Sequence, residues 1–492
     1  MICERIAERC DVEVLQYAYL NGCVLGPQAC YKAAAREYIE MSQWGLDRTI
    51  GWRKVLCNAA AAGGSLQLLK MARTNDCPWD YYTCREAAGS GHLGILQWAR
   101  FEGCPWDEST CSAAAGSGHL DVLQWARSKD CPWDETTCRA AAGSGHFDVL
   151  QWARSQDCPW DADTCSSAAR GGHFVILKWA RAHGCNWNHE TCASAAEGGH
   201  LDILQWTRSE GCPWEARTCS KAALGGNLVI LQWARAHGCQ WDHETCAGAA
   251  QGGHLEVLQW ARTNGADWGT STTSSAARGG HLEILQFARA EGCPWNAQAC
   301  SSAILKGHLN TLKWMMSHGC PWHRNANALA AQGGYLDILE WMQTSHRVLD
   351  TGGTCRSAAF AGPLAVLQWA RGVGFGWDSS TCSSAAANGH LDVVQWARGN
   401  GCDWDIDTCA EAARSGHLEV LQWVRCHGGP WDARICALAA EGGHFEVLKW
   451  AWLNGCPWDE TTCIDAAGAG RLDILEWARA EGCPYFHMWG TL

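Results

Sequence analysis

Short amphipathic segments recur along the chain, and the one that begins at Leu120 reads Leu-Asp-Val-Leu-Gln-Trp-Ala-Arg. Placed on a helix at about 100° per residue, Leu120, Val122 and Leu123 share one broad face with the Trp and Ala that follow. Asp121 and Gln124 fall on the opposite face. The segment therefore predicts an amphipathic helix with a wide buried side.

Another helix is predicted ahead of each such segment. Asp134 is a good N-cap, and Glu135 suits the positive end of the helix dipole. The Ala run that follows favours a helix, and its small side chains allow close packing. Gly143 and Gly145 then break the chain before the next amphipathic segment. Because no segment alternates with period two over a strand's length, the chain is predicted to be all-α.

The pair of helices repeats with a period of 27 residues, so that Gly118-His119 returns as Gly145-His146. We call the second residue of this pair the histidine position. It recurs at Asp11, Tyr38, Ser65, His92, His119, His146, His173, His200, Asn227, His254, His281, His308, Tyr335, Pro363, His390, His417, His444 and Arg471. No linker interrupts these 18 units, which predicts one continuous repeat array over residues 1–492.

The units around residues 297–363 depart from the rule. Asn327 replaces a Cys, and Met315-Met316 replaces the usual Ala-Arg. A one-residue insertion falls within Asp350-Thr351-Gly352-Gly353. We interpret this region as a bend, a weak joint or a specialised contact.

The repeat resembles the ankyrin family. The segment from Thr136 to Val149, TTCRAAAGSGHFDV, is similar to the ankyrin pattern TPLHxAAxxGHLxV, and the Gly-Ala-Asp-Trp turn at Gly265 is similar to the ankyrin Gly-Ala-Asp-Val. Ankyrin units run to about 33 residues, and the missing residues fall between Asp134 and Thr136, where ankyrins carry a β-hairpin finger. The resemblance implies a helix-turn-helix repeat solenoid without that finger, a histidine that hydrogen-bonds within the inter-helix turn, and protein–protein recognition without catalysis.

The 32 Trp and 31 Cys residues are explained largely by this register, because most recur at fixed places in the unit. Cys104, Cys111 and His119 suggest a repeated zinc or thiol ladder. Structural zinc sites usually have closer Cys pairs with about four ligands per site, and several units lack one of these residues. We therefore expect core packing by the Cys and Trp residues, with no metal and no cofactor. An enzyme would need a non-repeated cluster of polar residues, and the sequence contains none. We therefore expect no enzymatic activity and no catalytic residue.

Two positions vary most in chemistry from unit to unit. One follows the capping Asp, as in Ala162, His189, Ala216 and Arg324. The other lies five residues after the helix Cys and corresponds to the concave groove of ankyrins. We call its members the ridge and expect them to bind a partner: Arg170, Glu197, Leu224, Gln251, Arg278, Leu305, Gln332, Phe360, Arg414 and Glu441.

Composition limits the partners that we expect. The net charge is −13 with only 18% charged residues, which argues against nucleic acid as a partner. No apolar run reaches the roughly 18 residues of a membrane span, and Glu4 and Arg5 interrupt the place of a signal peptide. The sequence thus predicts a monomeric, intracellular protein of the cytoplasm, with the nucleus left open, and no membrane partner.

The function that the sequence predicts is a scaffold that binds partner proteins through the ridge. Two alternatives remain open. One is a zinc- or thiol-dependent protein that uses the repeated Cys and His residues, and the other is a rigid spacer without a specific ligand.

Overall fold

A computed structural model describes residues 32–33, 39–46, 50–345 and 353–484. Contacts divide the chain into two compact units, residues 1–267 and 268–492. The described residues form helices joined by turns and contain no strand, which confirms the all-α prediction and the absence of a β-hairpin finger from the described turns. None of the described helices is long and apolar enough to cross a lipid bilayer.

Each repeat contributes a first helix, before the histidine position, and a second helix after it. In residues 1–267 the first helices are α5 (Ile50–Gly63), α7 (Tyr81–Gly89), α9 (Glu108–Gly116), α11 (Glu135–Ser144), α13 (Ala162–Arg170), α15 (His189–Gly198), α17 (Ala216–Leu224) and α19 (His243–Gly252). The second helices are α4 (Ile39–Leu46), α6 (Leu66–Thr74), α8 (Leu93–Phe101), α10 (Leu120–Ser128), α12 (Phe147–Ser155), α14 (Phe174–Ala182), α16 (Leu201–Ser209), α18 (Leu228–Ala236) and α20 (Leu255–Thr263).

The same pairing continues in residues 268–492. The first helices there are α21 (Thr270–Gly279), α23 (Ala297–Leu305), α25 (Ala326–Gln332), α27 (Thr354–Ala361), α29 (Ser379–Ala387), α31 (Ile406–Arg414), α33 (Arg434–Gly442) and α35 (Glu460–Gly468). The second helices are α22 (Leu282–Ala290), α24 (Leu309–Ser317), α26 (Leu336–Thr344), α28 (Leu364–Val373), α30 (Leu391–Gly399), α32 (Leu418–Cys426), α34 (Phe445–Leu453) and α36 (Leu472–Ala480).

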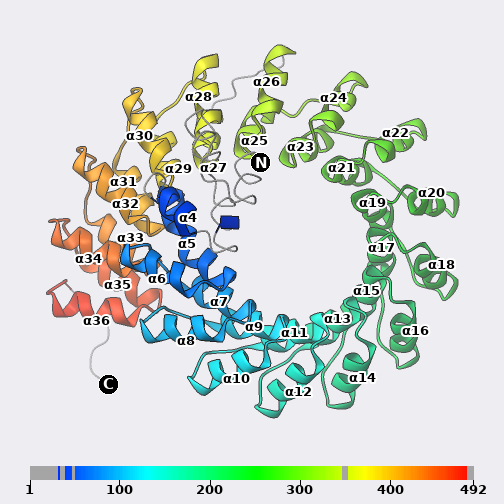
Figure 1. Ribbon diagram of the computed structural model, residues 1–492. Helices are drawn as coiled ribbons and strands as arrows, with labels where there is room; N and C mark the ends of the chain where they lie inside the picture. Colours follow the sequence, from blue (N-terminus) through cyan, green and yellow to red (C-terminus); the bar gives the residue numbers. More distant parts are fainter. Residues whose placement is uncertain (1–31, 34–38, 47–49, 346–352, 485–492) are drawn as a thin grey trace, which may run out of the picture. The chain divides into compact units, whose positions relative to one another are not determined.

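Within each of the two compact units, residues 1–267 and 268–492, the first helices pack side by side in one layer (Figure 1). The second helices form another layer behind them. Small residues let the first helices approach closely: a Cβ added at Gly116 would lie 3.3 Å from Cβ of Ala140, and one at Gly143 would lie 3.2 Å from Cβ of Ser167. The second helices carry Leu and Trp and are spaced further apart. The first helices therefore line the concave side of each unit, which Figure 1 shows.

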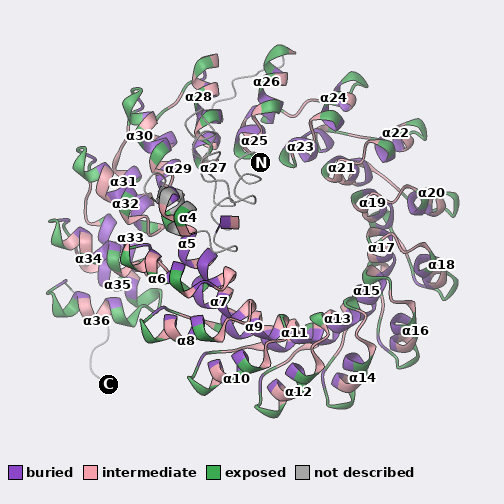
Figure 2. Cartoon of the chain, viewed as in Figure 1, coloured by how far each residue is buried: buried purple, intermediate pink, exposed green. Residues whose placement is uncertain are grey.

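The core lies between the two layers, where Figure 2 shows the buried residues. In α10, Val122, Leu123 and Ala126 are buried, whereas Asp121 and Gln124 are exposed, as the helical pattern predicts. Asp134 caps α11 by accepting a hydrogen bond from the backbone N–H of Thr136, which satisfies one free donor at the helix start. The predicted division of the unit into two helices is thus confirmed in sequence position and in burial.

The histidine position forms hydrogen bonds within the inter-helix turn and also to the preceding repeat. Within the turn, the backbone N–H of His200 donates to the carbonyl of Ala195 at 3.0 Å. His200 Nε2 donates to the carbonyl of Arg170 at 3.1 Å, across 30 residues of sequence. Its ring occupies space that a side chain at Gly172 would fill, because a Cβ there would lie 2.4 Å from the ring. Burial lowers the pKa of the equivalent His444, so this ring is neutral at pH 7 and suited to the same contact.

A stack of Arg on Trp also joins consecutive repeats. The Arg154 guanidinium lies 4.2 Å from the centre of the Trp160 ring and donates to the carbonyl of Cys158. Trp160 in turn meets Trp179 edge to face at 5.8 Å between ring centres. The same Arg–Trp stack is formed by Arg73, Arg100, Arg127, Arg181, Arg208, Arg235, Arg289, Arg371, Arg398 and Arg425. Met316 takes the Arg position in α24.

The irregular region predicted at 297–363 is described except for residues 346–352. Its helices still form pairs, but α25 has only 7 residues. His323 stands where other repeats have the capping Asp, and its Nδ1 accepts from the backbone N–H of Asn325 at 3.3 Å.

Candidate binding surface on the first helices

All ten predicted ridge residues lie in the last turn of a first helix, on the concave layer of their unit. Glu197 and Leu224 are half-buried and the other members are exposed. The backbone under them is fixed by the next repeat: the carbonyls of Arg278, Leu305 and Phe360 accept hydrogen bonds from His308, Tyr335 and His390 at 3.0, 3.3 and 3.2 Å. The ridge is therefore a row of varied side chains on a uniform, hydrogen-bonded frame.

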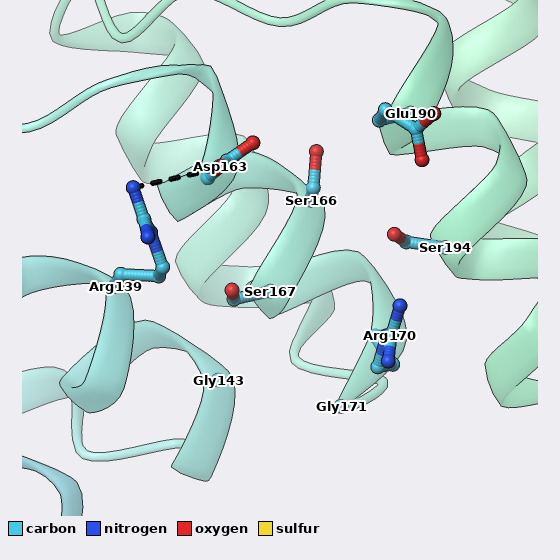
Figure 3. A pocket seen from close by; sticks show the side chains of 9 residues that line it. All are labelled: Arg139, Gly143, Asp163, Ser166, Ser167, Arg170, Gly171, Glu190 and Ser194. Carbon is cyan, nitrogen blue, oxygen red and sulfur yellow. Dashed lines mark ion pairs between the residues drawn. The ribbon is translucent and has the colours of Figure 1, made fainter. Parts of the chain in front are cut away.

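A hollow of about 490 Å³ lies on the concave side of α11, α13 and α15. Figure 3 shows Arg139 and Gly143 contributed by α11, Asp163 and Arg170 by α13, and Glu190 and Ser194 by α15. Ser166, Ser167 and Gly171 complete its wall. The hollow combines charged groups of both signs with hydroxyl groups, and Arg170 is the ridge residue among them.

The charged groups of this region are satisfied by one another. Arg139 Nη2 lies 2.7 Å from Asp161 Oδ2 and 3.3 Å from Asp163 Oδ2. Glu197 Oε2 lies 3.0 Å both from Arg170 Nη2 and from Lys221 Nζ. A further pair joins Arg217 Nε and Glu190 Oε1 at 2.8 Å. These pairs link α11 to α13, α13 to α15 and α15 to α17.

A second hollow, of about 420 Å³, lies on the concave side of α25 and α27. Its wall includes the ridge residues Gln332 and Phe360, together with Arg356. Asn325, Ala328, Gly353 and Ser357 also line it. Its lining carries a single charge and one exposed aromatic ring, so it differs in chemistry from the hollow around Arg170.

The structure brings only some of the predicted residues together. Arg170 meets Glu197, and Gln332 shares a hollow with Phe360. The sequence prediction did not include Arg139. It included the residue directly after the capping Asp as a variable position, but not the residue after that one. That neighbouring position holds Asp163, Glu190 and Arg217, and it also changes chemistry between repeats, which was the available signal.

The described Cys residues of the repeat pack in the interior. Among the described residues, no group of three or more His, Cys, Asp or Glu residues is placed to hold a metal ion. Cys104 Sγ donates to the carbonyl of Asp80 at 3.4 Å, and Cys212 makes the same contact with Asn188 at 3.3 Å. Burial raises the pKa of Cys57 and of Cys409 to about 12. Because these thiols contact backbone carbonyls and the described Cys residues are not grouped with other metal ligands, the zinc- or thiol-dependent alternative is not favoured.

Comparisons with known proteins find only distant structural likenesses, and these are to helical repeat proteins. No protein-family model matches the chain, and no curated protein matches it. Among solved structures it is similar to the pentatricopeptide repeat protein PPR10 from maize, with 15% identity, a TM-score of 0.29, and coverage of 99% of this chain and 89% of that one. PPR10 in complex with an 18-nt psaJ RNA element gives 15% identity, a TM-score of 0.30, and coverage of 97% and 88%.

The human ASB11 ankyrin repeat domain is also similar, with 15% identity and a TM-score of 0.26. This likeness covers 32% of the chain and 83% of that domain. At such TM-scores, the likenesses do not decide between the ankyrin and pentatricopeptide classes and do not indicate a shared partner.

The prediction that nucleic acid is not a partner of this chain is wrong. A helical repeat array similar to this chain has been solved with bound RNA. The physical error lies in the use of net charge, because −13 is a sum over the whole chain, whereas a ligand meets one face. The charge of each face must be considered separately.

Proposed function

We propose that the chain is a non-enzymatic binding scaffold, built as one continuous ankyrin-like array over residues 1–492, that holds a partner protein on its ridge. The observation that carries the proposal is the contrast between frame and ridge. The caps, histidine contacts and Arg–Trp stacks recur from repeat to repeat, whereas the ridge changes from Arg170 through Leu224 to Phe360. Solenoids commonly recognise partners through such extended concave surfaces.

The chemistry of the ridge supports a protein partner. Exposed Arg, Leu and Phe side chains lie on one layer, and Arg and aromatic residues are enriched in protein interfaces. Both hollows contain ridge residues, so the surface offers recesses as well as protruding side chains. The ankyrin assignment is supported by the Gly-His and Gly-Ala-Asp-Trp segments of the repeat.

The test is affinity capture from a native lysate with the full chain and with a ridge variant. The variant replaces Arg170, Leu224, Arg278, Leu305, Phe360 and Arg414 by Ala. These side chains are exposed or half-buried, so the variant should keep its helical circular dichroism. A protein partner held by the native chain should be lost by the variant, with binding weakened at least about tenfold.

A matched control replaces Gln124, Gln151 and Gln259 by Ala on the exposed side of the second helices. This variant should retain the partner. Identical captures by all three proteins would contradict a ridge interface. Treatment of the lysate with ribonuclease distinguishes a protein held directly from one held through RNA.

A further inference from the structure

Four consecutive first helices, α21, α23, α25 and α27, form a concave layer in which the described helices and their N-caps contain no carboxylate. Neither these helices nor their N-caps, Gly269, Asn296, Asn325 and Gly353, contain an Asp or a Glu. Elsewhere the cap alone usually supplies an Asp. We call this surface the acid-free face. It lies within residues 268–492 and includes the hollow at Phe360.

The acid-free face carries exposed cations: Arg278, Lys306, Arg324 and Arg356. Within the part of the chain that the structure describes, none of these side chains forms an ion pair. In a chain with a net charge of −13, four unpaired cations in or next to these four helices give the region a local charge of opposite sign.

The repeat explains why these cations are unpaired. Arg278 occupies the same position in its repeat as Arg170, but the partner position that holds Glu197 after Arg170 holds Leu305 after Arg278. Arg356 occupies the position of Arg139, and the position of Asp163 is filled by Ser380. Asp378 accepts from the backbone N–H and the hydroxyl of Ser380. Arg278 thus lacks the counterpart of Glu197, and Arg356 lacks the counterpart of Asp163. The counterpart of Asp161 is retained as Asp378, which caps α29 and forms no ion pair with Arg356.

Apolar side chains stand among these cations. Leu305 is 36% exposed and Phe360 is 48% exposed, and each lies in the last turn of its helix. Beside Phe360 the hollow offers the side chains of Asn325, Gln332 and Ser357, which can hydrogen-bond a peptide backbone. In the same layer, a carboxylate returns at Asp378, the N-cap of α29, which is the first helix directly after α27.

We infer that the acid-free face binds a short acidic peptide segment of the partner, with carboxylates beside the unpaired Arg residues and an apolar side chain beside Phe360. The inference rests on the proposed function and specifies the chemistry of the partner. Bidentate Arg–carboxylate contacts provide geometry as well as charge complementarity. The exposed Leu and Phe, the amides and the limited length of the face favour a peptide of mixed acidic and apolar residues.

The probe is a fluorescein-labelled peptide of Asp and Glu residues around a central Phe-Leu pair, titrated with the full chain by fluorescence anisotropy. A peptide with Asn and Gln in place of the acids and a single-stranded RNA of equal length are titrated in parallel. We expect the acidic peptide to bind at least about tenfold more tightly than its amide counterpart. Binding should weaken as salt is raised.

Matched variants locate the site. The double variant Arg278→Gln and Arg356→Gln should lose about tenfold in affinity for the acidic peptide. Leu305→Glu should have a similar effect, because it supplies Arg278 with the carboxylate that Arg170 receives from Glu197. The control, Arg434→Gln, alters an exposed Arg of a first helix that lies outside the ridge and already pairs with Asp407 and Asp432, and it should leave peptide binding unchanged.

The inference is overturned if the amide peptide binds equally well, if the Arg278 and Arg356 variant retains full affinity, or if only the RNA binds in a manner that this variant abolishes. Its failure is distinguishable from failure of the proposed function in the lysate capture. A partner lost by the six-residue ridge variant but retained by the Arg278→Gln, Arg356→Gln variant contradicts the acidic-peptide site alone. A partner retained by both variants contradicts the ridge interface itself.

Discussion

The concave sides of α11–α17 and of α21–α27 are made from the same repeat, but their charges are arranged differently. At α11–α17, Arg139, Arg170 and Lys221 are each held by a carboxylate at 2.7–3.0 Å. At α21–α27, Arg278 and Arg356 occupy equivalent positions and have no ion-pair partner among the described residues. Similar cations therefore stabilise contacts between neighbouring repeats at α11–α17 and are available to a ligand at α21–α27.

The two regions also differ in the contacts that hold consecutive repeats together. Arg154 stacks on Trp160, and the same stack recurs in neighbouring repeats, whereas α24 has Met316 at that position. Asp134 caps α11, while the N-caps of α21 and α27 are Gly269 and Gly353, which have no side chain to accept a hydrogen bond. Because stability in a solenoid is roughly a sum over repeats and their interfaces, α21–α27 should be the less stable of the two regions. Reduced internal pairing there is consistent with a binding surface.

The largest effect is expected from Arg154→Met, which gives a regular repeat the residue found at Met316. The change removes the stack on Trp160 and the donor to the Cys158 carbonyl. A half-buried cation–π contact and a charge-assisted hydrogen bond together suggest a loss of about 1–2 kcal/mol in unfolding free energy. Urea unfolding followed by circular dichroism measures the loss, and hydrogen exchange over residues 147–161 shows where it falls.

Arg154→Lys is the matched control, because it keeps the charge without the planar group and should give an intermediate loss. The reverse change, Met316→Arg, should stabilise α24 by a smaller amount, since Met316 is already buried. Equal stability of Arg154→Met and the native chain would show that the Arg–Trp stack does not hold consecutive repeats together.

The helical repeat could be predicted from the sequence because its determinants are local. The apolar face of Leu120, Val122 and Leu123, the cap at Asp134 and the Gly residues all act within about one helix length. The contact of His200 with Arg170 could not be derived in this way, because it joins residues 30 apart and depends on how repeats stack. The ankyrin resemblance indicated the hydrogen bond within the turn but not this contact between repeats.

The candidate site was predictable only in outline. Variation at one position of the repeat pointed to Arg170, Gln332 and Phe360, which do line hollows. It did not point to the pair of Arg139 with Asp163, because pairing requires the displacement between α11 and α13 as well as the residue types. Net charge was misleading for a related reason, since it averages the paired charges of α11–α17 with the unpaired ones of α21–α27.

A smaller effect is expected from Glu197→Gln, which removes the carboxylate shared by Arg170 and Lys221. The Glu197 side chain is 20% exposed and that of Arg170 is 57% exposed, so solvent screens part of the interaction. We expect a loss of up to about 1 kcal/mol in unfolding free energy at low salt, and a smaller loss at high salt. Urea unfolding at the two salt concentrations measures both.

Glu441→Gln is the control, because Glu441 occupies the same position and has no ion pair among the described residues. Burial raises the pKa of Asp465, and the charge of Glu441 raises it further. Removal of that charge relieves its repulsion with Asp465 and should leave stability at neutral pH unchanged or slightly higher. A loss as large as that of Glu197→Gln would contradict a specific role for the Arg170–Glu197–Lys221 cluster.

The smallest effect is expected from Gly269→Asp, which restores the usual cap to α21. Gly269 has an extended backbone with φ −165°, and an added Cβ meets nothing within 4 Å. The new carboxylate should accept from the backbone N–H of Ser271 and stabilise the chain by a few tenths of a kcal/mol, measured by urea unfolding. Gly353→Asp is the control and should destabilise, because Gly353 has φ +103°, which L side chains rarely adopt. If Gly269→Asp stabilises the chain yet weakens binding of the acidic peptide, the missing cap is explained by the charge of the face, because stability alone would favour Asp at that position.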